Sequence, residues 1–539
     1  MFADSHVHPL MKFLHNGRVN VWDSFKGRTV RLRIRDDLVG VPQYSQADFT
    51  KLVKARVQII FCALIPPEQK FMFAKLAPPL DTAVEKLVSG LLSIPHAKVK
   101  QYQSSKYDHY ELLLTERDLL FSNANKPVSI RVNANRNITA QFTLCRTFAE
   151  IETIIQRNHT QKDQWTIAVI PAVEGAHALG VGHLQLFGAV SRDASDALLM
   201  ERLDKLKGLG TDSSTGKVWQ FPPLLMNLTH AFANGLCGHA QALSGSMRCI
   251  FEYDEPYGPN DVGPNFLAGL HKGITPLGER VIKRMLNLDD ESASRNDMGR
   301  RIIPDIKHMS LPTRLRYYEI LDQANAGKPP DKRIPVVMSH AAVTGGQMPT
   351  SVDLNGLTLE QYLLQTDEDY TYNHSAGFNP WSINLYNEEL LRIHETRGLL
   401  GLIMDERVLA GKKKIAKLKA AIEGRAGLRN PFRGYSYTGM CTKLLTDQIF
   451  HVVDTVFKNA TSIPPAQVWD IFCIGSDFDG QINPLDYITE ATDFPQMKVE
   501  LIRQLGEARF APYLAGQSPA QLAEKICQEN VIGFLERNL

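Results

Sequence analysis

The 539-residue sequence predicts a (β/α)8 barrel with long insertions over its active face. Eight short runs of apolar or β-branched residues recur along the chain, and stretches with the spacing of amphipathic helices lie between them. Most of these runs end in a residue capable of metal or proton chemistry. Continuous apolar strands that alternate with helices indicate a parallel sheet covered on both faces, and eight of them favour closure into a barrel.

Turn or charged residues bound each expected strand. In chain order, the strands are expected within residues 1–8, 57–65, 165–175, 224–232, 301–310, 334–343, 398–408 and 468–480. Helices are expected between them, for example at 81–92, 277–286 and 387–396.

Three insertions stand outside this pattern, although residues 1–539 are expected to form a single barrel. At about 11–53, 94–164 and 345–380 the connections are far longer than ordinary loops of such barrels. Insertions of this kind commonly cover the active face or form contacts between subunits. The sequence leaves the two roles open, and with them the choice between a monomer and a homo-oligomer.

The composition is that of an ordinary globular protein, with 44% apolar and 22% charged residues. Sixty basic and 58 acidic residues leave a formal charge of +2, so no chain-wide field attracts nucleic acid or anionic lipid. The densest basic cluster, at 412–419, has apolar residues at helical spacing and is interpreted as a solvated amphipathic helix. Docking of this cluster on a membrane or on nucleic acid is the alternative.

The seven cysteines include no CxxC pair, which argues against a disulfide framework and against a cysteine zinc site. No signal peptide is recognisable at the N-terminus, and no apolar run approaches the roughly 18 residues of a membrane span. We therefore expect a cytoplasmic protein with reduced thiols, unless a leader has been removed.

Candidate metal ligands follow several of the expected strands, and the carboxyl ends of barrel strands meet on one face. His6 and His8 are separated by one residue on an extended segment, so both imidazoles project to the same side and can bind one metal ion. Asp4, two residues earlier, is expected to orient a ligating imidazole or to be an ordinary strand-end polar residue.

Glu174, His308 and His340 complete the expected binuclear centre. A carboxylate at Glu174 can bridge two cations that would otherwise repel each other, and the alternative is a helix-capping or salt-bridged glutamate. Imidazole and carboxylate ligands without thiolate favour zinc, with manganese, iron or cobalt as alternatives.

Two further residues are candidates for catalysis. Asp477 follows the last expected strand and is assigned the transfer of a proton from a metal-bound water to the leaving nitrogen. Asp479 is interpreted as structural, and a calcium-like or capping motif is the alternative for the pair. His230 ends the fourth strand and is expected to polarise the scissile carbonyl, or else to be a packed histidine.

These motifs, taken in order as His-x-His, VEG, LTH, KHMS, VVMSH and GSDFDG, resemble those of the membrane (renal) dipeptidase family of the amidohydrolase superfamily. The resemblance is scattered through most of the chain and extends to the segment SPAQLAEKICQENVIGFLER. It implies that His6 and position 8 bind one zinc, that Glu174 bridges, and that His308 and His340 bind the other zinc. It further implies that His230 contacts substrate and that Asp477 transfers the proton. The implied substrate is a dipeptide whose C-terminal residue can be D as well as L.

The chain departs from this family at two places. The family has His-x-Asp where this chain has His6-Val7-His8, which makes the site one unit more positive. The family also binds the substrate carboxylate with an arginine after the sixth-strand histidine, whereas residues 379–391 contain none. Arg407, past the seventh strand, is the candidate substitute.

The sequence therefore predicts a binuclear zinc amide-bond hydrolase with a dipeptide or other small-molecule substrate, a metal-bridging hydroxide and Asp477 as proton shuttle. Hydrolysis of another amide, a lactone or an ester within the same superfamily is the first alternative. A catalytically silent barrel that retains its metals is the second.

Overall fold

The computed structural model describes most of the chain. The described residues are 1–34, 37–73, 89, 94–183, 193–211, 218–243, 265–291, 293–295, 297–372, 377–425, 430–459 and 462–539. The expected helix at 81–92 falls almost wholly outside them.

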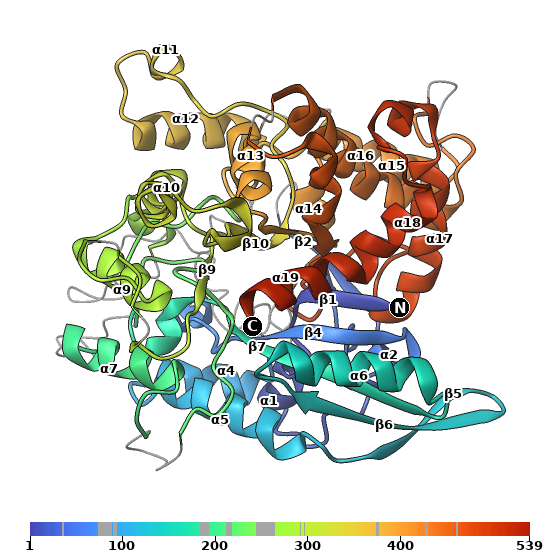
Figure 1. Ribbon diagram of the computed structural model, residues 1–539, viewed down its shortest axis with the longest axis horizontal. Coiled ribbons are helices and arrows are strands. Elements are labelled where there is room, and N and C mark those ends of the chain that lie inside the picture. Colours follow the sequence, from blue (N-terminus) through green and yellow to red (C-terminus); the bar gives the residue numbers. More distant parts are fainter. Residues whose placement is uncertain are drawn as a thin grey trace.

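Eight parallel strands close into a barrel, which confirms the predicted fold class (Figure 1). Each strand pairs with the next one of the barrel along the chain, and the last pairs with the first. The strands are β1 (Phe2–Val7), β4 (Val57–Leu64), β7 (Gln164–Val173), β8 (Leu225–Asn227), β9 (Ile303–Asp305), β10 (Val337–Ala341), β11 (Leu399–Leu402) and β12 (Phe472–Ile474).

Several strands are shorter than the apolar runs that predicted them. The run at 468–480 begins in a 3-10 helix, η5 (Pro465–Asp470), and only Phe472–Ile474 pair as a strand. A proline at the start of η5 presets a helical φ, and the buried Val468 and Trp469 serve a 3-10 turn as well as a strand. The residues after the short strands β8, β9 and β12 lie at the carboxyl end of the barrel, where they are free to turn toward its axis.

Helices follow or precede the strands and cover the barrel. The main ones are α2 (Phe49–Lys54), α6 (Phe148–Thr160), α7 (Asp196–Leu206), α9 (Pro276–Leu286), α10 (Leu311–Asn325), α13 (Asn387–Glu395), α16 (Tyr437–Asn459), α17 (Phe494–Leu505), α18 (Pro519–Glu524) and α19 (Asn530–Asn538). The helices expected at 277–286 and 387–396 are confirmed as α9 and α13. The basic cluster at 412–419 lies on α15 (Lys412–Ile422), as expected.

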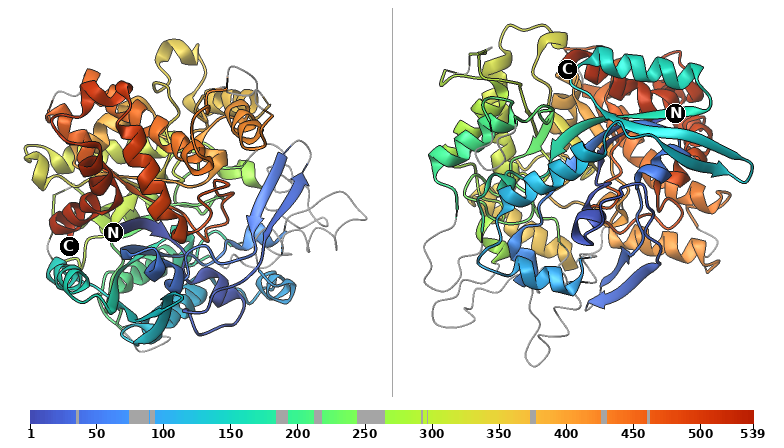
Figure 2. Two further views of the ribbon diagram at one scale, coloured as in Figure 1. Left: turned by 90° about the vertical axis from the view of Figure 1, so that its right-hand side faces the viewer. Right: turned by 90° about the horizontal axis from the view of Figure 1, so that it is seen from below.

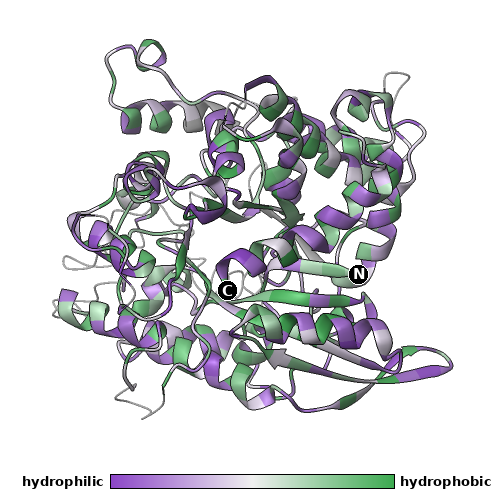
Figure 3. Ribbon diagram, in the orientation of Figure 1, coloured by the Kyte–Doolittle hydropathy of each residue, from purple (hydrophilic) through white to green (hydrophobic). Residues whose placement is uncertain are grey.

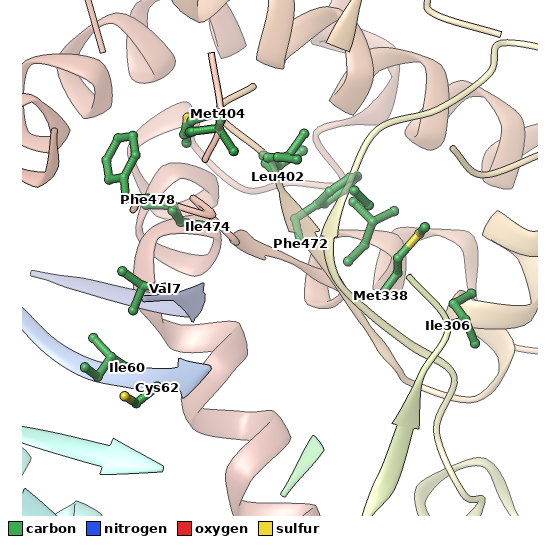
Figure 4. Packing of buried hydrophobic residues seen from close by; sticks show 14 of the residues in the cluster. Val7, Ile60, Cys62, Ile306, Met338, Leu402, Met404, Phe472, Ile474 and Phe478 are labelled. Atoms are coloured by element: carbon green, nitrogen blue, oxygen red, sulfur yellow. The ribbon is translucent and has the colours of Figure 1, made fainter. Parts of the chain in front are cut away.

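The strands bury both of their faces, as the continuous apolar runs predict. One cluster of buried side chains takes residues from all eight barrel strands and from α19, where Phe534 lies against Phe61. The second and larger cluster packs the outer faces of the strands against the helices. Figure 3 shows the apolar colour concentrated on the central strands, and Figure 4 shows the second cluster around Ile60, Met338 and Phe472.

The three long insertions carry secondary structure of their own. Residues 11–53 contain α1 (Met11–His15) and the antiparallel pair β2 (Thr29–Ile34) and β3 (Asp37–Pro42), which projects from the barrel in Figure 2. Residues 94–164 contain α4 (His96–Tyr102), α5 (His109–Asn123), β5 (Val128–Asn133), β6 (Arg136–Leu144) and α6, and β6 pairs in parallel with the first half of β7. Residues 345–380 contain α11 (Ser351–Leu354) and α12 (Leu359–Tyr372). None of the helices in the described part of the chain has the length and apolar character to cross a bilayer.

Candidate metal centre

All seven side chains that the sequence proposes for the site meet at the carboxyl end of the barrel. They come from or directly follow six of the eight strands, and all but His230 are at least nine-tenths buried. The residues are His6, His8, Glu174, His230, His308, His340 and Asp477.

Glu174 lies at the centre of the group, and its two carboxylate oxygens face different imidazoles. Oε2 lies 3.0 Å from Nε2 of His8 and 3.5 Å from Nε2 of His6. Oε1 lies 3.1 Å from Nε2 of His308 and 3.5 Å from Nε2 of His340. One carboxylate oxygen for each pair of imidazoles is the arrangement that a bridge between two cations requires.

The distances and the donor set fit two divalent metal ions. Ligand atoms bonded at about 2.1 Å in a tetrahedron lie about 3.4 Å apart, close to the separations around Glu174. Nε2 of His6 and Nε2 of His8 are 3.1 Å apart, so their lone pairs repel each other unless a proton or a cation lies between them. Nε2 of His340 is buried without a hydrogen-bond partner. Such a buried acceptor facing a carboxylate fits a metal ligand better than a packed histidine.

Ser339 and Asp305 orient the imidazoles of His6 and His340 toward the centre. The sequence did not predict this role. The Ser339 hydroxyl donates to a carboxylate oxygen of Asp305 and lies 2.9 Å from Nδ1 of both His6 and His340. Because the hydroxyl hydrogen is used by Asp305, both imidazoles donate their Nδ1–H to the serine oxygen. In a neutral ring with this tautomer, Nε2 is the acceptor nitrogen, and in both residues it faces Glu174, the orientation in which histidine can bind a metal ion.

Asp4 does not orient an imidazole ring, the role that its position suggested. Its carboxylate accepts the backbone N–H groups of His6 at 3.1 Å and of Ser476 at 3.0 Å, together with the Ser476 hydroxyl. A short carboxylate at this position reaches the backbone of β1 and of the neighbouring β12 segment rather than a ring. Asp4 therefore fixes the strand that carries His6.

Asp477 stands beside the first pair of histidines. Its Oδ1 lies 3.4 Å from Nε2 of His8 and 3.9 Å from Nε2 of His6. Burial raises the pKa of Asp477, although its hydrogen bond with His8 opposes that shift. A carboxylate with a raised pKa is suited to accept and return a proton near neutral pH.

The backbone has an unusual conformation at two site residues, one after β9 and one after β12. Asp477 and His308 both have positive φ, at 58° and 68°, a region that residues other than glycine seldom adopt. Such conformations persist where the surroundings hold them, and they gather at functional sites. Gly480 leaves room for this turn, because a Cβ on Gly480 would lie 2.0 Å from Oδ1 of Asp477.

His230 is positioned by Glu68, a residue that the sequence did not single out. Its Nδ1 lies 2.8 Å from Oε1 of Glu68, which also accepts the N–H of Ala231. Burial raises the pKa of Glu68, but the hydrogen bond and the charges of His230 and His177 outweigh it and hold the pKa at about 2. Burial lowers the pKa of His230, and the bond to Glu68 with the nearby carboxylates reverses that effect and raises it. His230 is thus held as a hydrogen-bond donor, with Nε2 4.0 Å from Oε1 of Glu174.

Asp479 and Arg407 have partners within the chain. Asp479 accepts the backbone N–H groups of Gln46 and Ala47 and pairs with Lys12 at 2.9 Å, in agreement with a structural role. The guanidinium of Arg407 binds both oxygens of Asp405, with the closest approach at 2.6 Å.

A cavity of about 130 Å³ opens onto the centre. The polar residues that line it include Glu174, His230, Lys307, Arg407 and Asp477. The apolar residues that line it include Val41, Phe71, Leu243, Ile383, Val408 and Ile482. An apolar cavity with a few convergent polar groups is typical of a small-molecule site.

No family model and no curated protein matches this sequence. The chain is similar to a solved dipeptidase, a metallopeptidase of family M19, with 15% identity, a TM-score of 0.47 and coverage of 100% of this chain and 98% of the other. It is also similar to a metallopeptidase from Rhodobacter sphaeroides bound to a phosphinate mimic of L-Ala-D-Ala, with 16% identity, a TM-score of 0.48 and coverage of 100% and 99%. For the probable dipeptidase PvdM from Pseudomonas aeruginosa, the identity is 14%, the TM-score 0.46 and the coverage 100% and 95%. At these identities and TM-scores, the inference of function rests on the side chains at the barrel mouth.

Replacing Ser339 by alanine is expected to weaken metal binding by one to two orders of magnitude, because two imidazoles lose the oxygen that fixes their orientation. The measurement is the zinc dissociation constant, by competition with a chromophoric chelator. Ser5→Ala is the matched control, because Ser5 is also buried and its hydroxyl donates to backbone carbonyls of Ser339 and Ile474. An equal loss in both variants would show that the effect is general destabilisation.

Proposed function

We propose that this protein is a binuclear zinc-dependent hydrolase of amide bonds and that its leading substrates are dipeptides. The main support for the proposal is the position of Glu174. Each of its two carboxylate oxygens faces a different pair of imidazoles. A glutamate with a purely structural role would not require four imidazoles from three other strands around it. The adjoining cavity supplies space for a substrate beside this pair of sites.

When bound, the two metal ions would polarise the scissile carbonyl and lower the pKa of a water molecule. Asp477 accepts the proton of the attacking water and later delivers it to the leaving nitrogen. His230 donates a hydrogen bond to the carbonyl oxygen as negative charge develops on it, and Glu68 keeps the ring in the orientation that this requires. Apolar side chains line the cavity beside these groups and offer a surface for the apolar part of a substrate.

The choice of a dipeptide over other amides follows from the motif resemblance to the membrane dipeptidase family. The same residues serve another amide, a lactone or an ester, and such a hydrolase is the second candidate. A silent barrel is disfavoured because the chain retains Asp477, the residue assigned to proton transfer, 3.4 Å from Nε2 of His8.

The purified full-length protein is expected to contain two divalent metal ions per chain and to hydrolyse members of a panel of L,L- and L,D-dipeptides. Removal of the ions by a chelator should abolish hydrolysis, and zinc should restore it. The measurements are elemental analysis and product release on the same samples. Two bound metal ions without hydrolysis of any peptide, lactone or ester would favour the silent barrel.

Asp477→Asn is expected to retain both metal ions and to lower kcat by orders of magnitude, since it removes the proton acceptor and preserves the shape of the side chain. Asparagine also tolerates the positive φ at this position. The control is Asp479→Asn, two residues away, which should affect stability far more than turnover, because Asp479 binds backbone and Lys12. Unchanged turnover in Asp477→Asn would contradict the assigned role.

A further inference from the structure

The strand β5 (Val128–Asn133) is an edge of the ten-stranded sheet, and within the described part of the chain β6 is the single strand that pairs with it. The barrel strands have a neighbour on each side, because the barrel is closed. The pair of β5 and β6 leaves the barrel and projects from the body of the protein in Figures 1 and 2. Backbone N–H and C=O groups on such an open edge can pair with a strand of another chain.

These two strands lie at the end of the barrel opposite the metal centre. β6 pairs with residues 164–169, at the beginning of β7, whereas Glu174 follows the last residue of that strand. Both strands belong to the insertion at 94–164, for which the sequence leaves open a cover over the active face or a contact between subunits. At the opposite end of the barrel they do not cover that face, which leaves contact between subunits.

The two faces of β5 differ in exposure. Ile130 is 6% exposed and packs in the larger apolar cluster, and Val128 and Val132 are half-buried at the margin of that cluster. The residues between them, Ser129 and Arg131, are exposed on the opposite face. The core of its own chain therefore holds the inner face of β5, and the open edge and the outer face remain accessible.

We propose that β5 pairs with the β5 of a second copy of this chain, antiparallel and about a two-fold axis at Ile130. Such a contact is isologous, and residues opposite each other in an antiparallel pair lie on the same face. Ile130 then meets its own counterpart, and each Val128 lies opposite a Val132. Each Ser129 lies opposite an Arg131, so a hydroxyl oxygen faces a guanidinium and charges of the same sign stay apart.

The neighbouring registers are less favourable. An axis at Arg131 would place two arginines opposite each other, and an axis at Ser129 would bring Pro127, which has no backbone N–H, into the paired segment. Arg131 is the single charged residue of β5, and its guanidinium donates to the carbonyl of Ala134 at 2.7 Å. It therefore points toward the hairpin turn, where the pairing with β6 becomes irregular, and away from the first half of β5.

The test is the oligomeric state of the full-length protein across a concentration series, measured by analytical ultracentrifugation. The wild type should form a dimer with a measurable dissociation constant. Ser129→Arg places an arginine opposite Arg131 at two positions of the dimer and should weaken association about tenfold. Ser129→Glu places a carboxylate there and should strengthen association. A wild type that is monomeric at every concentration would overturn the proposal.

The combination of Ser129→Arg with Arg131→Ser exchanges the two side chains and should restore the wild-type dissociation constant, since each arginine again faces a serine. Thr139→Arg is the matched control, because Thr139 is exposed on β6 and pairs with Ser129 within the chain but lies one strand in from the edge. It should leave the dissociation constant unchanged. A dimer that tolerates Ser129→Arg, or that Ser129→Glu weakens to the same extent, would refute this interface.

Discussion

The structure depends on one buried carboxylate. Glu174 lies at the mouth of the barrel within 3.5 Å of nitrogens from four imidazoles, in a place from which water is largely excluded. Burial raises the pKa of Glu174. The charge at His6 and the hydrogen bonds with His308, His6 and His8 outweigh burial and hold that pKa well below its usual range. An ionised carboxylate is tolerated there only with compensating positive charge, from protonated imidazoles or from metal ions. Ser339, Asp305 and Asp4 hold the neighbouring groups in place.

Closure of the barrel brings Glu174 and the imidazoles together. Glu174 follows β7, and its backbone N–H donates to the carbonyl of Leu64 on β4. The neighbouring strand therefore fixes the position of Glu174 along the barrel axis. Ser339 on β10 connects His6 on β1 with Asp305 on β9 through a single hydroxyl. Hydrogen bonds of this kind satisfy buried polar groups and at the same time set the register of distant strands. The fold and the site are stabilised by the same contacts.

The sequence predicted those parts of the site that local pattern reveals. A histidine or carboxylate at the end of an apolar strand has a defined direction in a closed barrel, and all seven such candidates meet in the structure. Glu68 was missed because it follows β4 in a loop and reaches His230 across 162 positions of sequence. The short 3-10 segment before β12 was expected as strand because a brief apolar run suits either structure.

The unusual features of this site affect the net charge that the centre would carry with metal ions bound. Two divalent ions would bring four positive charges, of which Glu174 and Asp477 neutralise two. A carboxylate at position 8 would neutralise a third, but this chain has His8 there. With both ions bound, the centre would therefore keep a net positive charge. A net positive charge at the centre would favour a substrate that carries a carboxylate.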